Sequence, residues 1–253
     1  MTMLIDQWTG VLERIQAACL RCKRSAQEVQ LLAVSKTVPF ARLAELARAG
    51  QVDFGENYIQ EAVQKIEAAS TQWASQPGAV LKTRPVWHCI GPVQSNKTRL
   101  VATHFDWLHT VDRLKIAQRL SEQRPAFLAP LKVLIQVNVD QGQTKSGIPP
   151  EEVLPLAQAV MGLKGLSLKG IMTMPDPEPD HARQVALHRV GKAVFDHVLQ
   201  ATGNPSWDTL SMGMTQDLEA AIEAGSTLVR VGTAIFGARS AVHEGAERPA
   251  PRA

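Results

Sequence analysis

The sequence predicts an α/β fold, a single (β/α)8 barrel with one extra N-terminal helix. Eight short runs rich in aliphatic residues alternate with amphipathic helical stretches along the chain. A chain of 253 residues, 45% of them hydrophobic, is long enough to fill one such barrel. Two of the runs, LLAVS and KVLIQVNV, are almost continuously apolar, which is typical of parallel strands covered on both faces. An open, doubly wound sheet is the alternative arrangement of the same elements.

The elements follow one another in a regular order. A helix is expected first, over residues 6–24, because Val11, Ile15 and Ala18 share one face. The β-like runs then lie at 31–36, 52–55, 86–91, 106–111, 132–139, 168–174, 209–213 and 228–232. Helices are expected between them at 40–50, 57–69, 113–123, 149–161, 181–202 and 215–225. The barrel is therefore predicted to occupy residues 1–240, and the small, charged, Pro-rich remainder, 241–253, is predicted to be a disordered tail.

Composition argues against several classes of protein. The net charge is only +3 and the Lys and Arg residues are scattered, so a nucleic-acid partner is not expected. No apolar run approaches the ~20 residues of a membrane span, and the N-terminus lacks the pattern of a secretion signal. Three cysteines do not make a disulfide framework, which favours a reducing, cytoplasmic location. Cys19 and Cys22 form a C-x-x-C, but it lies within a predicted helix and has no second pair, so no metal site is expected.

Two loops at the predicted barrel mouth have the composition of a phosphate cradle. Barrels of this kind carry their chemistry at the C-terminal ends of the strands and often bind phosphate after strands 7 and 8. Here Ser211 and Gly213 follow the seventh strand, and Gly232 and Thr233 follow the eighth. The glycines permit close approach of the backbone to a ligand, and the hydroxyls are hydrogen-bond donors. Unpaired N–H groups at the start of helix 215–225 would add to the positive potential that attracts a phosphate. Ordinary tight turns are the alternative interpretation.

Lys36 ends the first apolar run, LLAVSK. Strand 1 lies next to strand 8 when a barrel closes, so this amine would lie beside the phosphate cradle. Partial burial favours a neutral amine, which attacks an aldehyde to give a Schiff base. A ligand with both an aldehyde and a phosphate fits this pair of features, and pyridoxal 5′-phosphate (PLP) is such a ligand. The alternative for Lys36 alone is a solvated lysine at a strand end.

Arg230 alternates with Val229 and Val231 along the eighth strand and therefore faces the opposite way. If it points into the barrel mouth, it can donate to the pyridine nitrogen of PLP. Arginine stays protonated, so it would keep that nitrogen unprotonated and make the ring a weak electron sink. This argues against transamination-like chemistry. The alternative is an outward arginine paired with a helix carboxylate.

Several long motifs, in order, resemble the YggS/PROSC-like pyridoxal phosphate homeostasis protein family over about residues 15–239. They are LLAVSKTVP, DFGENYIQEAVQKI, WHCIGPVQSNKTRLV, VLIQVNVDQGQTKSGI, LKGIMTMP and LSMGMTQDLEAAIEAGSTLVRVGTAIFG. The resemblance implies a barrel similar to the N-terminal domain of alanine racemase, with PLP held as a Schiff base on Lys36. It also implies phosphate contacts around SMGM and RVGT, and Arg230 at the pyridine nitrogen. Asn57, in FGEN, looks like a cofactor-lining residue, with a helix N-cap as the alternative.

The loop after the fifth strand departs from the family pattern. A carboxylate usually lies between the Asn and the Lys of this loop, whereas NVDQGQTK has Gly142 and neutral glutamines, with Asp140 as the nearby acid. Lys145 matches a family lysine associated with secondary handling of PLP. The changed loop weakens that assignment for this chain and leaves the assignment of Lys36 untouched.

Two classes of function compete. The first is a monomeric PLP-binding protein of vitamin B6 homeostasis, which buffers the cofactor or delivers it to PLP-requiring apoenzymes without turnover, so that no residue is catalytic. The second is a PLP-dependent amino-acid racemase, which needs one base on each face of the cofactor. Related racemases use a tyrosine and a second domain, whereas this chain has one tyrosine, Tyr58, and no residues left for another domain. A class I aldolase, which also uses a Schiff-base lysine, is a third hypothesis.

Overall fold

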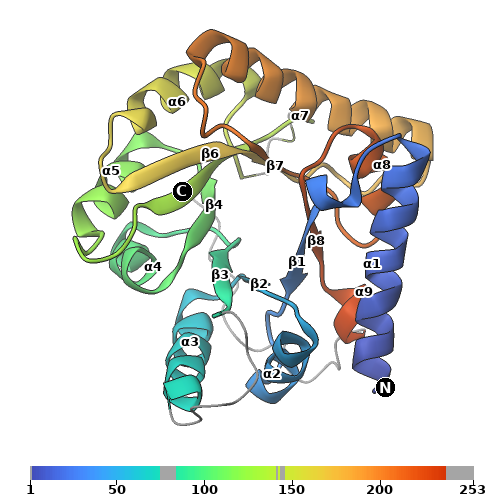
Figure 1. The fold of residues 1–253 in the computed structure, drawn as a ribbon. Helices are drawn as coiled ribbons and strands as arrows, with labels where there is room; N and C mark the ends of the chain where they lie inside the picture. The colour runs from blue at the N-terminus through green and yellow to red at the C-terminus, as the bar shows by residue number, and fades with distance from the viewer. Residues whose placement is uncertain (1, 75–83, 141, 143–145, 238–253) are drawn as a thin grey trace.

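Residues 2–74, 84–140, 142 and 146–237 are described by a computed structural model. Within these residues eight parallel strands pair in sequence order into a closed barrel, and helices surround it (Figure 1). The (β/α)8 prediction is confirmed, and the open doubly wound sheet is wrong because the last strand pairs with the first. Lys145 and the predicted tail, 241–253, lie outside the described residues.

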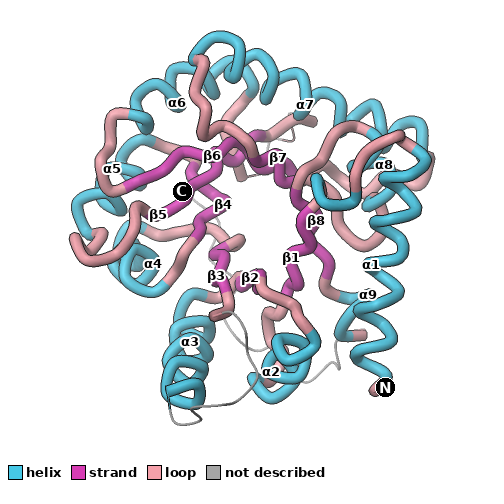
Figure 2. The backbone as a smooth tube through the Cα atoms, in the orientation of Figure 1, coloured by secondary structure: helices cyan, strands magenta, loops and turns pink. Residues whose placement is uncertain are grey.

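The strands form the inner ring and the helices the outer layer (Figure 2). The strands are β1 (Gln30–Val34), β2 (Asp53–Glu56), β3 (Val86–Cys89), β4 (Trp107–Val111), β5 (Leu131–Val137), β6 (Leu166–Thr173), β7 (Thr209–Ser211) and β8 (Leu228–Val231). The α-helices are α1 (Met3–Arg21), α2 (Phe40–Ala49), α3 (Ile59–Ala74), α4 (Thr98–His104), α5 (Leu114–Gln123), α6 (Val153–Met161), α7 (His181–Thr202), α8 (Leu218–Glu223) and α9 (Thr233–Phe236). Short 3₁₀ turns are η1 (Ala26–Glu28), η2 (Ser95–Lys97) and η3 (Pro150–Glu152).

Several helices differ from the sequence expectations, and three of them show why. Helix α1 begins at Met3 rather than at residue 6, because the Thr2 side chain caps it by accepting from the N–H of Ile5. The sequence pattern does not predict α4, whose seven residues are too few to display a helical period. Helix α8 begins at Leu218 instead of residue 215, because the three preceding residues form a turn.

Helix α1 packs against α8 and α9 on the outside of the barrel (Figure 1). The apolar stripe expected from the sequence is the buried face of this helix. The Arg14 guanidinium donates to both carboxylate oxygens of Glu219, at 2.8 and 2.9 Å, and also to the Thr215 carbonyl at 2.9 Å. The extra N-terminal helix therefore braces the loop that follows β7. None of the described helices has the length and apolar character needed to cross a membrane.

A β-bulge lies in β6, where Val133 of β5 pairs with Leu168 but the next residue pairs with Gly170. Gly170 has φ 149°, and a Cβ added there would lie 1.9 Å from the Thr209 carbonyl oxygen. The bulge therefore requires glycine, both for its backbone conformation and for the close approach of β7.

We expect Gly170→Ala to lower the free energy of unfolding by more than about 1 kcal/mol, because the alanine meets backbone and not a side chain that can move. Urea unfolding measures the effect. Gly10→Ala in α1 is the matched control, since apart from its chain neighbours and the helix's own backbone no described atom lies within 4 Å of its added Cβ. Alanine should stabilise that helix by about 0.5–1 kcal/mol. Similar effects of the two substitutions would contradict the close packing at the bulge.

Candidate functional site

A cavity of about 590 Å³ opens at the C-terminal ends of the strands, and we call it the mouth cavity. Five of the seven residues that the sequence analysis selected line it: Lys36, Asn57, Arg230, Gly232 and Thr233. The other two, Ser211 and Gly213, are buried and are not among the described lining residues. The structure thus brings most of the predicted residues to one place, although they come from strands far apart in sequence.

Lys36 is half-buried and lies two residues beyond the end of β1. The next residue, Thr37, has φ 63°, in the left-handed region that β-branched residues rarely occupy. Its N–H donates to Glu61 at 2.9 Å, and its hydroxyl donates to the Lys36 carbonyl at 2.6 Å. Such a conformation costs about 1–3 kcal/mol and persists only where surrounding contacts impose it. The turn that sets the direction of Lys36 is therefore held by specific hydrogen bonds.

A buried ion pair fixes the end of β1 directly before Lys36. The Lys65 ammonium of α3 donates to the Ser35 carbonyl at 2.9 Å and to the Glu56 carboxylate at 3.0 and 3.2 Å. It also lies 2.6 Å from Glu61. The Ser35 hydroxyl donates to Glu56 at 2.6 Å. Burial raises the pKa of Glu56, against the opposing effects of Lys65 and Ser35. We call Lys65, Glu56 and Ser35 the Lys65 clamp.

Arg230 faces the barrel interior and is 5% exposed. One terminal nitrogen donates to the carbonyl and the hydroxyl of Ser211, each at 2.8 Å, and the other donates to the Thr173 carbonyl at 2.9 Å. Burial lowers the pKa of Arg230 to about 10, with Asp217 opposing, so the guanidinium is still protonated at neutral pH. These bonds use three of its five N–H groups. The outward alternative is wrong, because Arg230 lines the mouth cavity.

The loops after β7 and β8 meet beside Arg230. The Thr233 hydroxyl donates to the Thr215 hydroxyl at 3.1 Å, so the two loops present adjacent hydroxyl groups to the mouth cavity. The sequence analysis does not identify Thr215 as a site residue, although it directly follows SMGM. A Cβ on Gly232 would lie 3.3 Å from the Val34 carbonyl oxygen, so this glycine lets β8 approach β1.

The cradle differs from the sequence expectation in three details. The Ser211 hydroxyl oxygen accepts from Arg230 inside the barrel, and Ser211 is not among the described residues that line the cavity. Gly213 has φ 91°, and a Cβ there would lie 2.4 Å from that of Ala221, so it permits packing on α8 rather than contact with a ligand. The N–H of Met214 donates to Asp217 at 2.6 Å, which occupies a donor at the start of the turn before α8.

Asp217 is itself held by His188, whose Nε2 lies 3.0 Å from the carboxylate. Its pKa lies below the usual range, because its hydrogen bonds from His188 and Met214 outweigh the desolvation that raises it. Asp217 thus places a negative charge on the cradle side of the cavity, where it limits the net positive potential. This charge balances part of the positive charge of Arg230.

Asn57 follows β2 and lines the mouth cavity, and its side chain carries a buried acceptor, Oδ1, without a hydrogen-bond partner among the described residues. Helix α3 begins at Ile59, so Tyr58 and not Asn57 occupies the N-cap position. A Cβ on Gly91 would lie 2.1 Å from the Asn57 carbonyl oxygen, so this glycine allows the loop after β3 to pack against Asn57. Buried orphan acceptors of this kind are expected where a ligand completes the hydrogen bonding.

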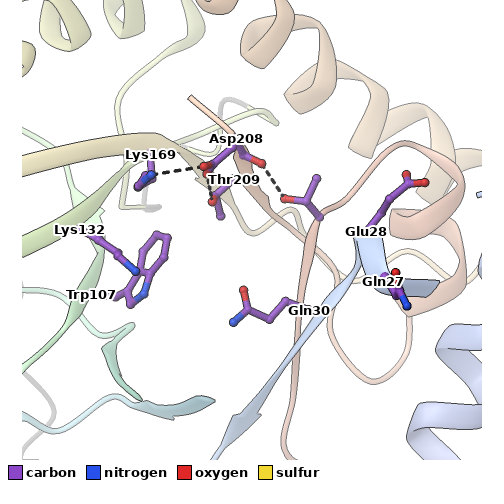
Figure 3. Close-up of a pocket in the computed structure, with 9 residues that line it drawn as sticks. Gln27, Glu28, Gln30, Trp107, Lys132, Lys169, Asp208 and Thr209 are labelled. Carbon is purple, nitrogen blue, oxygen red and sulfur yellow. Dashed lines mark hydrogen bonds and ion pairs between the residues drawn. The ribbon is translucent and has the colours of Figure 1, made fainter. Parts of the chain in front are cut away.

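A second hollow, of about 300 Å³, lies at the opposite end of the barrel, around the starts of the strands (Figure 3). In it the Lys169 ammonium pairs with Asp208 at 3.3 Å, and the Lys132 ammonium lies 5.0 Å from the centre of the Trp107 ring. None of the residues selected from the sequence lines this hollow. This end of such barrels usually serves stability, so the mouth cavity is the candidate site.

Comparison with known proteins gives a consistent result. Residues 11–240 match the family described as "Alanine racemase, N-terminal domain". The chain is 50% identical over 230 residues to the "Pyridoxal phosphate homeostasis protein" of Haemophilus influenzae, which covers 91% of this chain and 93% of that protein. It is 52% identical over 229 residues to the protein of the same name from Escherichia coli, which covers 90% and 94%.

Solved structures agree with these sequence relatives. A structure of PipY from Synechococcus elongatus, with PLP bound, superposes with a TM-score of 0.73 at 31% identity, over 88% of this chain and 98% of PipY. An unknown protein from Bifidobacterium adolescentis gives 0.82 at 35% identity, over 92% and 94%. An alanine racemase of Clostridium difficile gives 0.67 at 14% identity over 90% of this chain and 56% of its own length, which shows a shared fold.

We expect Lys65→Met to lower the free energy of unfolding by about 3–5 kcal/mol, because it leaves the Glu56 carboxylate buried without its cation. Chemical denaturation measures the change. The double variant Lys65→Met, Glu56→Leu should recover much of the loss, since it removes the orphan charge as well. Lys169→Met is the matched control: its partner, Asp208, is 57% exposed, so the loss should be about 1 kcal/mol or less. Equal losses for the two lysines would contradict the clamp.

Proposed function

The chain belongs to the pyridoxal phosphate homeostasis protein family, built on the alanine racemase N-terminal domain, and we propose that it binds PLP in the mouth cavity. In this proposal Lys36 is the anchoring amine, the loops carrying Thr215 and Thr233 hold the phosphate, and Arg230 faces the ring nitrogen. The observation that carries the proposal is the joint placement of an amine, a cationic donor and paired hydroxyls around one cavity. PipY, a homologue that spans most of this chain, binds PLP, which supports it.

The residues of the cavity fit this cofactor. Its volume of about 590 Å³ is ample for one PLP molecule. Asn57 lines the cavity, and Arg230 keeps two N–H groups beyond those used inside the barrel. When bound, PLP supplies a reactive aldehyde and an aromatic ring that can act as an electron sink. Lys36 would hold the cofactor through its amine, which is the kind of group that condenses with an aldehyde with loss of water.

Arg230 favours storage of the cofactor over its use in turnover. A protonated guanidinium donates to the ring nitrogen and keeps that nitrogen unprotonated, so the ring withdraws electrons weakly. The racemase alternative also needs a second base opposite Lys36. Tyr58, its candidate from the sequence, is 45% exposed and is not among the described residues that line the cavity. We therefore propose a role in PLP homeostasis, by buffering the cofactor or delivering it to apoenzymes, as a cytoplasmic monomer without robust turnover.

We expect borohydride reduction of the PLP-loaded protein to fix one PLP on the peptide that contains Lys36. Mass spectrometry of the digested protein locates the adduct, and absorption spectroscopy follows the visible band of bound PLP. Lys36→Ala should lose both the band and this adduct. Lys36→Arg is the matched control, because it keeps the positive charge but offers no nucleophilic amine at neutral pH. An adduct of the wild-type protein that maps to another lysine would show that the anchor is misassigned.

We further expect the PLP-loaded protein to racemise alanine and serine no faster than free PLP does. The reason is that the cavity lacks the tyrosine that the racemase mechanism requires opposite the lysine. Chiral chromatography of the amino acids after long incubation measures the rate. Lys36→Ala serves as the blank for any contaminating racemase. Turnover well above free PLP that disappears in Lys36→Ala would establish the racemase alternative instead.

A further inference from the structure

The interior of the barrel contains a chain of polar residues that the proposed cofactor site does not use directly. Asp53, His88, His109, Ser211 and Arg230 are all buried; the two histidines and Ser211 are 0% exposed. They come from β2, β3, β4, β7 and β8 in turn. The interiors of such barrels are usually filled by branched aliphatic side chains. Buried polar groups are costly unless each is hydrogen-bonded, so this departure calls for a reason.

The five side chains form one continuous series of hydrogen bonds. An Asp53 carboxylate oxygen lies 3.0 Å from Nε2 of His88, and Nδ1 of His88 lies 2.9 Å from Nε2 of His109. Nδ1 of His109 lies 3.2 Å from the Ser211 hydroxyl, which lies 2.8 Å from a terminal nitrogen of Arg230. Strands β4 and β7 are not neighbours in the sheet, so the contact between His109 and Ser211 crosses the barrel interior. We call these five residues the interior relay.

The residues at the two ends of the relay require every hydrogen bond in it to run the same way, with donation from Arg230 toward Asp53. Arg230 can only donate, so the Ser211 oxygen accepts from it, and the single Ser211 hydrogen is left for Nδ1 of His109. An ionised Asp53 can only accept, so Nε2 of His88 carries a hydrogen. With neutral rings, His109 then donates from Nε2 to the unprotonated Nδ1 of His88. The reverse direction would turn an unprotonated His88 nitrogen toward the carboxylate and leave the Ser211 hydrogen without an acceptor.

Burial keeps both imidazole rings neutral, which this direction requires. It lowers the pKa of His88, against the opposing effect of Asp53. The pKa of His109 lies well below the usual range because of burial, and the positive charge of Arg230 lowers it further. Trp107 stacks on the His88 ring with a centroid separation of 5.2 Å and an interplanar angle of 8°. This tryptophan also lines the hollow at the opposite end of the barrel (Figure 3), and it covers the His88 ring.

We propose that His88 and His109 are positioning residues for Arg230, and that they act through the fixed Nε2–H tautomers of the interior relay. The relay keeps the Ser211 oxygen as an acceptor for the guanidinium. It therefore holds the orientation in which the remaining N–H groups of Arg230 can face the cofactor ring. The cofactor part of this inference rests on the proposed function, whereas the tautomers are a property of the protein without any ligand.

Ring-nitrogen NMR of the ligand-free protein tests the tautomers. Histidine labelled with ¹⁵N is introduced, and the His109 signals are identified by their loss in His109→Gln. His88 is identified by the same comparison with His88→Gln. We expect both rings to be neutral at pH 7, with hydrogen on Nε2 and none on Nδ1. An imidazolium ring, or hydrogen on Nδ1 of either residue, would overturn the relay, whether or not PLP binds.

The positioning role is tested on the PLP-loaded protein with His109→Gln, which can replace one of the two hydrogen bonds of His109 but not both. We expect the Kd for PLP to rise by about tenfold or more, the size typical for a weakened hydrogen bond to a charged group, and the visible band of bound PLP to shift. Leu120→Ala is the matched control: Leu120 is fully buried on α5, in the helix layer outside the barrel, and belongs neither to the interior relay nor to the described cavity lining, so it should lower stability without moving the band.

Each outcome of this experiment has a distinct meaning. A folded His109→Gln with the wild-type band and Kd would overturn the positioning role. A band that moves equally in Leu120→Ala would also overturn it, because the effect would then be general loosening of the barrel. If His109→Gln does not fold, Ser211→Ala supports the same readouts, since it removes the oxygen between His109 and Arg230. A wild-type protein that binds no PLP would refute the proposed function and leave the NMR test of the relay standing.

Discussion

The hydrogen-bonded pairing of β1 with β8 is the constraint on which the candidate site depends. Ala33 pairs with Val231, so the residues that follow each of them leave the barrel side by side. Lys36 and Thr233 reach the same cavity for this reason, although almost 200 residues separate them in sequence. Gly232 permits this approach, because a side chain there would press on the Val34 carbonyl. A register shift of one residue would turn Arg230 from the interior to the helix layer, since side chains alternate along a strand.

Much of the fold and part of the site could be predicted from the sequence, because both depend on local patterns. The apolar runs and helical periods identify the strands and most helices, and strand ends identify Lys36 and Arg230 as mouth residues. The short α4 shows no full period, and the start of α8 depends on the Asp217 contact with Met214, which no pattern reveals. The motif around Ser211 predicts a phosphate contact because it lies at the mouth, but the direction of one hydroxyl depends on tertiary contacts such as that with Arg230.

The histidines of the barrel interior show a different limit of sequence analysis. His88 and His109 lie in strands whose other residues are mostly apolar, and each alone could be an ordinary buried histidine. Their role depends on closure of the barrel, which brings His109 into contact with Ser211 across the interior. Only then does a continuous connection exist between Asp53 near the start of β2 and Arg230 at the mouth. The sequence does contain an indication of this network, namely polar residues inside strands that are otherwise apolar. Such residues are expected where a buried network or a functional group lies.

Several unfavourable features of this molecule lie around the mouth cavity, which argues that they serve the ligand and not the fold. Thr37 has a strained backbone, Asn57 has an unpaired buried oxygen, and Lys65 and Glu56 are buried charges. A barrel selected for stability alone could replace the ion pair with apolar side chains at little or no cost. A ligand that binds only the folded protein raises the free energy of unfolding as the ligand concentration rises above Kd. Occupancy by PLP would therefore offset the cost of a site whose geometry is fixed before the cofactor arrives.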